Sequence, residues 1–251
     1  MFRIFLLLFL TVSLWSCTAQ PRFAQENLKI HKQLAEIFIK QNQYTRAIEE
    51  LKLALKQDPC DPEIYNLLGL AYMGKYEYLK AEENFRKAIA LKPDFSEAYT
   101  NLGSLMMLEK KYTLAIKYFK EALKNPCYLN SYIPLTNMGW AYFQLGETKK
   151  AIDTLFKAYQ QNPRYPRVLI YIGLINLKTG KLKTAEFYFK QALKLDSTSG
   201  EARYYLAEVF FREGKQDLAK DLWKSIILLD PNSEWAKKAT ARLYLLKETN
   251  S

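Results

Sequence analysis

Residues 62–95 read PEIYNLLGLAYMGKYEYLKAEENFRKAIALKPDF, and this stretch decides the fold. Its composition favours helix, because Leu, Lys, Ala and Glu, which are among the commonest residues of the chain, are good helix formers. Small residues such as Gly69 and Ala81 would let two helices approach closely, and large ones such as Tyr72 and Phe85 would fill the space beside them. The proline near the end cannot donate a helical hydrogen bond. The stretch therefore predicts two antiparallel helices.

The same pattern recurs along nearly the whole chain, at an interval of about 34 residues. Its anchor alanines are Ala47, Ala81, Ala115, Ala151, Ala185 and Ala219, and only the interval from Ala115 to Ala151 is longer, by two. Four residues after each anchor stands a large apolar residue: Leu51, Phe85, Phe119, Leu155, Phe189 or Trp223. Twelve to thirteen residues before each anchor, an apolar residue is followed by Gly or Ala, as in Leu68-Gly69. Together these positions reproduce the signature of the tetratricopeptide repeat (TPR).

This resemblance implies an all-α fold, a TPR α-solenoid wound as a right-handed superhelix. No unit can bury its apolar face alone, so the units must stack. We expect six helix-turn-helix repeats, a capping helix and a short tail at 248–251. The repeats are placed at about 28–61, 62–95, 96–129, 132–165, 166–199 and 200–233, and the capping helix at 234–247, with Trp235, Ala239 and Leu243 on one face. Two additional residues within 125–132 predict a bend or twist before the fourth repeat.

Residues 1–16 resemble a lipoprotein signal peptide. One positive charge precedes an apolar run over residues 4–14, which is too short to span a bilayer and has the length of a signal-peptide core. A small residue and Cys17 then follow, as in the bacterial lipobox, where the cysteine becomes the lipidated (palmitate-bearing) first residue. Ordinary secretion with cleavage near Ala19 and an uncleaved anchor are the alternatives. Residues 17–27 are interpreted as a tether.

Charge and location bear on possible partners. The net charge is +11, which indicates either a solvated basic surface or one attracted to anionic lipid or an acidic partner. Thr18 follows the predicted lipidated cysteine, and the lack of Asp there favours the outer membrane by resemblance to the sorting rule of enteric-type bacteria. No nucleic-acid motif is present, and we expect no nucleic-acid partner.

Residues that could carry chemistry are sparse. The only histidine, His31, takes a first-helix position that Tyr65 holds in the next repeat, so we expect it to pack. No group of His, Cys, Asp and Glu has the spacing of a metal site. We therefore expect no enzyme, cofactor or metal. Cys60 and Cys127 fall in turns two repeats apart, about 20 Å by helix-packing distances, whereas a disulfide needs about 7 Å. They should be free thiols or form intermolecular bridges.

The predicted binding surface is the groove lined by the first helix of each pair. Its apolar character is typical of a protein-binding surface, which would take a helix or an extended peptide. Lys32 is present, but Glu36 stands where a carboxylate clamp of chaperone-binding TPRs needs Asn, so we reject that mode. By register, the inward positions are Ile39, Asn66, Leu70, Met73, Thr100, Met107, Trp140, Phe143, Ile170, Leu174, Leu177, Tyr204 and Phe211.

The whole layout resembles the type IV pilus biogenesis lipoproteins, the TPR pilotins. The stretch Asn125-Pro126-Cys127-Tyr128, followed by the helix LTNMGWAY at 135–142, is similar to the central region of that family. The resemblance implies an outer-membrane lipoprotein on the periplasmic side that binds secretin or pilus-assembly subunits. The alternative is a general exported TPR adaptor that scaffolds another envelope complex, such as cell-wall hydrolases. The oligomeric state is left open.

Overall fold

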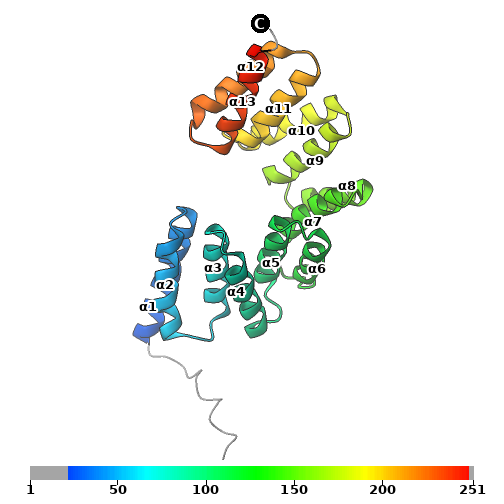
Figure 1. Cartoon of the computed structure of the whole chain (residues 1–251). Coiled ribbons are helices and arrows are strands. Elements are labelled where there is room, and N and C mark those ends of the chain that lie inside the picture. The colour runs from blue at the N-terminus through cyan, green and yellow to red at the C-terminus, as the bar shows by residue number, and fades with distance from the viewer. Residues whose placement is uncertain (1–21, 249–251) are drawn as a thin grey trace, which may run out of the picture. The chain divides into compact units, whose positions relative to one another are not determined.

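The computed structural model describes residues 22–248, and all regular secondary structure in that range is helical (Figure 1). The predicted signal peptide, Cys17 and residues 249–251 lie outside the described part. The helices are α1 (Arg22–Lys40), α2 (Tyr44–Gln57), α3 (Pro62–Gly74), α4 (Tyr78–Leu91), α5 (Ser96–Leu108), α6 (Tyr112–Ala122), α7 (Tyr132–Gln144), α8 (Thr148–Gln161), α9 (Pro166–Lys178), α10 (Leu182–Leu195), α11 (Gly200–Arg212), α12 (Gln216–Leu229) and α13 (Glu234–Glu248).

The predicted all-α TPR fold is confirmed. Each predicted repeat holds one pair of helices, from α1 and α2 in the first to α11 and α12 in the sixth. α1 begins at Arg22, before the expected start of the array at residue 28, because residues 22–27 contain neither Gly nor Pro and continue the helix. No helix within residues 22–248 is long and apolar enough to cross a membrane.

Local sequence signals set the ends of several first helices. Asp61 caps α3, because its carboxylate accepts the Glu63 N–H at 2.8 Å, and Pro62 occupies the first turn. Pro166 likewise occupies the first turn of α9, but Tyr165 before it makes no side-chain cap. Ser199 caps α11 by accepting the Ala202 N–H at 3.3 Å. These caps satisfy amides that would otherwise lack a partner at the helix start.

The two helices of a pair approach closely where one of them carries a small residue. A Cβ added at Gly69 would lie 2.4 Å from the Phe85 ring, and one at Gly173 would lie 2.7 Å from the Phe189 ring. The anchor alanines and the large residues that follow them are all fully buried, or nearly so. The predicted pairing of small and large side chains is therefore the core of each repeat.

The helices group into two compact units. One contains α1–α5 and the other contains α6–α13, so the division falls between the two helices of the third predicted repeat. Within each unit, every helix packs on its neighbours in the chain, and successive first helices also touch, as α3 does α5 and α9 does α11. The bend expected before the fourth repeat stays a prediction.

The last helix closes the second unit. α13 packs on both α12 and α11. Ala239 is fully buried, and Trp235 and Leu243 are half-buried. These three residues form the apolar face that the sequence predicts.

Candidate functional site

In the first unit, the predicted groove residues lie on α1, α3 and α5. Ile39, Leu70, Met73 and Met107 are half-buried, while Asn66 and Thr100 are buried. The Asn101 amide donates to Oδ1 of Asn66 at 2.9 Å and so joins α3 to α5. This surface therefore combines partly exposed apolar side chains with the hydrogen-bonded pair Asn66 and Asn101.

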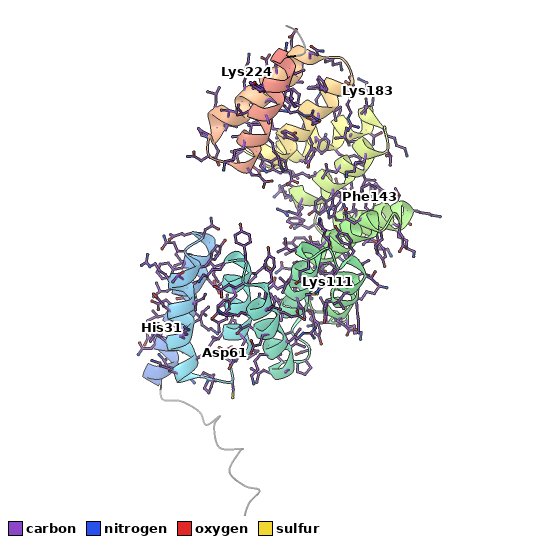
Figure 2. The ribbon with its side chains drawn as sticks, in the orientation of Figure 1. His31, Asp61, Lys111, Phe143, Lys183 and Lys224 are labelled. Atoms are coloured by element: carbon purple, nitrogen blue, oxygen red, sulfur yellow. The ribbon has the colours of Figure 1, made fainter. Side chains whose placement is uncertain are left out.

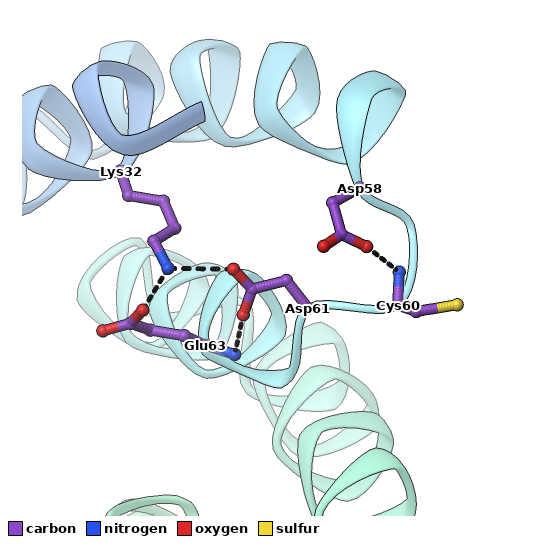
Figure 3. A network of polar contacts seen from close by, with 5 residues as sticks. All are labelled: Lys32, Asp58, Cys60, Asp61 and Glu63. Carbon is purple, nitrogen blue, oxygen red and sulfur yellow. Dashed lines mark hydrogen bonds and ion pairs between the residues drawn. The ribbon is translucent and has the colours of Figure 1, made fainter. Parts of the chain in front are cut away.

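Lys32 has a structural role in this unit (Figure 3). Its ammonium reaches from α1 to the start of α3, where it binds Oδ2 of Asp61 at 2.8 Å and the carboxylate of Glu63. Burial opposes its charge, but the hydrogen bonds to both carboxylates outweigh burial and raise the pKa of Lys32. The ammonium is thus already engaged by two carboxylates of its own chain.

In the second unit, α7 and α9 bring aromatic rings together. Trp140 stacks on Tyr171, with ring centroids 4.8 Å apart and planes 18° apart, and Phe143 lies 5.4 Å from Trp140. Trp140 and Phe143 are half-buried, and Phe143 is labelled on α7 in Figure 2. These rings present apolar area that costs little conformational entropy to hold in place, which suits protein binding.

Three predicted groove residues on α9 are more deeply buried than a surface position requires. Ile170, Leu174 and Leu177 are each 4% exposed. The reason is that α9 contacts α7 on one side and α11 on the other, besides α8 and α10. Ile170 is a core side chain, whereas Leu174 and Leu177 reach the wall of a cavity.

This cavity lies between α9, α11 and α13 and has a volume of about 280 Å³. Its apolar part combines the two leucines with tyrosine rings, and its polar part is mostly cationic. The lining residues are Leu174, Leu177, Lys178, Tyr204, Tyr205, Glu208, Arg212, Lys238 and Arg242. Sequence reasoning named Leu174, Leu177 and Tyr204 but missed the charged residues.

A buried ion pair fixes one side of the cavity. Glu208 on α11 is only 6% exposed, and Arg242 on α13 donates to its two carboxylate oxygens at 2.7 and 2.6 Å. A two-point contact of this kind is strong and directional. These hydrogen bonds to Glu208 raise the pKa of Arg242, so the guanidinium stays charged at neutral pH.

An aromatic cluster borders the cavity. The rings of Tyr204, Tyr205 and Trp235 lie with centroids 5.5–5.6 Å apart, and the Lys238 ammonium sits 4.1 Å from the Trp235 centroid. Burial, followed by the charge of Glu201, raises the pKa of Tyr205 to about 12. The phenol therefore keeps its proton and can donate to a ligand.

Phe211 does not line this cavity. Its ring is half-buried and lies 5.9 Å from the core residue Trp223 on α12. On its other neighbour, α13, the Arg242 guanidinium lies 6.0 Å from the Phe211 ring centroid.

The missed cations follow a simple rule. Lys178 and Arg212 stand one repeat length apart in the sequence, and so do Glu208 and Arg242. In an array with a period of about 34 residues, such positions lie side by side on successive first helices. Charged residues at this spacing were therefore a usable signal for the cavity.

The residues considered for chemistry have structural surroundings. Nδ1 of His31 lies 2.6 Å from Oε2 of Glu50, which joins α1 to α2. Neither Cys60 nor Cys127 is joined in a disulfide to another described residue, and the Cys60 N–H donates to Asp58 (Figure 3). Within residues 22–248, no group of three or more His, Cys, Asp or Glu could hold a metal ion.

Family models of the tetratricopeptide repeat match most of the chain. Models described as "TPR repeat" and "Tetratricopeptide repeat" match residues 35–75, residues 67–126 with 136–199, and residues 176–243. One curated relative, the Sol locus transcriptional repressor of Clostridium acetobutylicum, is 31% identical over 81 residues. That match covers 32% of this chain and 26% of the repressor, so the chain spans about a quarter of that relative.

Two solved structures are similar over most of the chain. The Pseudomonas aeruginosa pilF structure has a TM-score of 0.70 at 19% identity, and that of PilW, described as a widely conserved type IV pilus biogenesis factor, has 0.73 at 23%. Each match covers 88% of this chain and 100% of the other. At these identities the likeness shows the fold. Together with the repeat models, it makes this chain a member of the tetratricopeptide repeat family, a scaffold of stacked helix pairs for protein–protein interaction.

Proposed function

We propose that this protein is a non-catalytic outer-membrane lipoprotein that assists type IV pilus biogenesis by binding secretin or pilus-assembly subunits. The observation that carries the proposal is the match over the full length of both pilus-biogenesis structures, rather than over a few repeats. The lipobox-like Cys17 and the resemblance of residues 125–142 to the central region of the pilotins support it.

In this mechanism the lipid on Cys17 supplies location and the first helices supply recognition. A single acyl chain binds membranes only weakly, so stable anchoring requires more than one chain on Cys17. The half-buried rings of Trp140 and Phe143 would hold an apolar segment of the partner. Because Trp140 is already stacked on Tyr171, little ordering is required on binding.

Deletion of the gene tests the cellular role. We expect loss of secretin multimers from the outer membrane and loss of pili, both restored by the wild-type gene. Complementation with Cys17→Ser should fail to restore them and should abolish labelling by a palmitate analogue. Intact multimers and pili in the deletion strain would instead favour the alternative, an adaptor for another envelope complex.

A surface substitution tests the binding face. Trp140→Glu should reduce co-purification of the secretin subunit about tenfold or more, because a charge replaces a central aromatic contact. Phe156→Glu is the matched control, since Phe156 is an exposed ring on the second helix α8. Circular dichroism verifies that both variants keep native helix content. Equal co-purification with the two variants would exclude the aromatic cluster as the binding site.

A further inference from the structure

The cavity between α9, α11 and α13 has two cations with no carboxylate partner among the described residues. Lys178, the last residue of α9, and Arg212, the last residue of α11, are both exposed. Within residues 22–248, neither has a carboxylate partner, and Arg212 donates only to the Leu177 carbonyl at 3.2 Å. Two such charges on neighbouring helices create a local positive potential.

The other charges of the cavity are already paired. Glu208 is the only carboxylate in the lining, and Arg242 binds both of its oxygens. The Lys238 ammonium lies 2.6 Å from Oε1 of Glu234, one turn earlier on α13. Lys178 and Arg212 therefore remain as the available charge.

We propose that this cavity binds a partner segment in which an acidic side chain stands next to a leucine or phenylalanine. The carboxylate meets Lys178 and Arg212, and the apolar side chain lies on Leu174, Leu177 and Tyr204. The proposal rests on the proposed use of the first-helix surface for protein binding, but it requires no link to pili.

Size and lining favour a protein side chain over other occupants. The volume of about 280 Å³ is at the lower limit of small-molecule pockets, roughly 300–1,000 Å³. The two leucines at the wall are nearly fully buried, so they form a fixed apolar surface. The Glu208–Arg242 pair holds α11 and α13 together, so the cavity exists before the ligand arrives.

Fluorescence anisotropy with three labelled peptides tests the ligand chemistry. The acidic probe is acetyl-Gly-Ser-Asp-Phe-Leu-Asp-Ser-Gly-amide, and the neutral probe has Asn in place of both Asp. The third probe is the neutral peptide with a free carboxyl terminus. We expect the acidic probe to bind about tenfold or more tighter than the other two, and more weakly as salt rises, because exposed charges are screened.

Variants of the full chain test the location. Lys178→Glu and Arg212→Gln should each lower the affinity for the acidic probe about fivefold or more. Lys178→Gln removes the charge without reversing it, and it serves as the second variant if Lys178→Glu disturbs α9. Lys224→Glu is the control for overall charge, because Lys224 is exposed on α12, in the second helix of its pair (labelled in Figure 2). It should bind the probe as the wild type does.

Several outcomes would overturn the proposal. Equal affinity for the acidic and neutral probes would show that the cavity does not recognise the carboxylates of the peptide. A preference for the free carboxyl terminus would identify a chain end as the ligand instead. Equal losses of affinity for the acidic probe in Lys178→Glu and Lys224→Glu would mean that the peptide responds to the overall charge of the protein. If Lys178→Glu no longer sedimented with anionic vesicles but bound the peptide as before, the cavity would be a membrane-binding site. Intact pili in a deletion strain would contradict only the pilus role.

Discussion

The helix–helix turns of the first three repeats and those of the last three reach the same left-handed backbone with different residues. The first set uses Asn42, Tyr76 and Lys110, at φ of 59°, 62° and 59°, and the last set uses Gly146, Gly180 and Gly214, at 81°, 79° and 78°. A side chain in this region costs about 1–2 kcal/mol, whereas glycine adopts it freely. The helix pair therefore imposes the turn, and the first half of the chain bears strain that the second avoids.

Contacts between the paired helices, by contrast, are alike in both halves. Gly69 faces the Phe85 ring in the first unit, and Gly173 faces the Phe189 ring in the second. Residue type is thus constrained where two helices touch and less constrained where the chain turns. Substitutions at equivalent positions can test this difference.

The largest effects are expected at the helix contacts. Gly69→Ala and Gly173→Ala should each destabilise the protein by about 2–3 kcal/mol, because the new Cβ would overlap a buried ring. Thermal unfolding followed by circular dichroism should show a similar drop for both variants, about 5–10 °C at this chain length.

A second-site change verifies the cause. Phe85→Leu should recover part of the stability of Gly69→Ala, since a smaller side chain makes room for the Cβ. If Gly69→Ala were harmless while Gly173→Ala were costly, the two halves would differ in packing as well as in turns.

A smaller effect is expected at the glycine turns. Gly180→Ala should cost about 1–2 kcal/mol through the backbone alone, because φ is +79° and a Cβ there meets no atom within 4 Å. Chemical denaturation should show a lower midpoint at an unchanged slope. No change in midpoint would mean that the turn relaxes to a conformation open to alanine.

The opposite sign is expected at the turns of the first half. Lys110→Gly should stabilise by about 0.5 kcal/mol, because relief of left-handed strain exceeds the entropy that glycine adds to the unfolded chain. Asn42→Gly should gain less, since Asn tolerates this region and Oδ1 of Asn42 accepts the Tyr44 hydroxyl at 2.7 Å. Destabilisation by Lys110→Gly in the same denaturation assay would contradict the strain.

The sequence predicts the repeats well because their period, about 34 residues in a TPR array, is visible without knowing any contact. Gly69 and Phe85 are recognisable as partners, since every repeat offers a small and a large residue at those positions. The surface is harder to predict. A residue such as Leu174 faces inward on its helix, but its burial depends on how closely α7 and α11 approach α9.

The charged side of the candidate site was missed for a related reason. Lys178 and Arg212 are ordinary helix-end cations within their own repeats. They can be recognised as part of one site only when the two repeats are aligned and the ion pairs of the neighbouring charged residues are known. Pairing of Arg242 with Glu208 depends on side-chain geometry, which periodicity does not contain.

The smallest predicted effect concerns turns linked by charge. Glu77 in the first unit binds Lys80 and Lys75 at 2.6 and 3.0 Å, both close to it in the chain, whereas Glu213 binds Lys215 at 2.7 Å and also Lys183 on α10 at 3.2 Å (Lys183 is labelled in Figure 2). Hydrogen bonds to Lys80 in one case and to Lys215 in the other lower the pKa of both carboxyls.

A lowered pKa means that each carboxylate contributes stability above the usual pKa of glutamate, about 4.3, and loses it as pH falls through the folded value. Glu213→Gln should therefore lower the melting temperature by about 1–3 °C near pH 7, and the difference should close as pH falls through the lowered pKa of Glu213. Glu77→Gln should shift it less, because Lys75 and Lys80 both belong to the same repeat as Glu77. Equal shifts for both variants at neutral pH would show that the link between successive turns adds nothing to the stack.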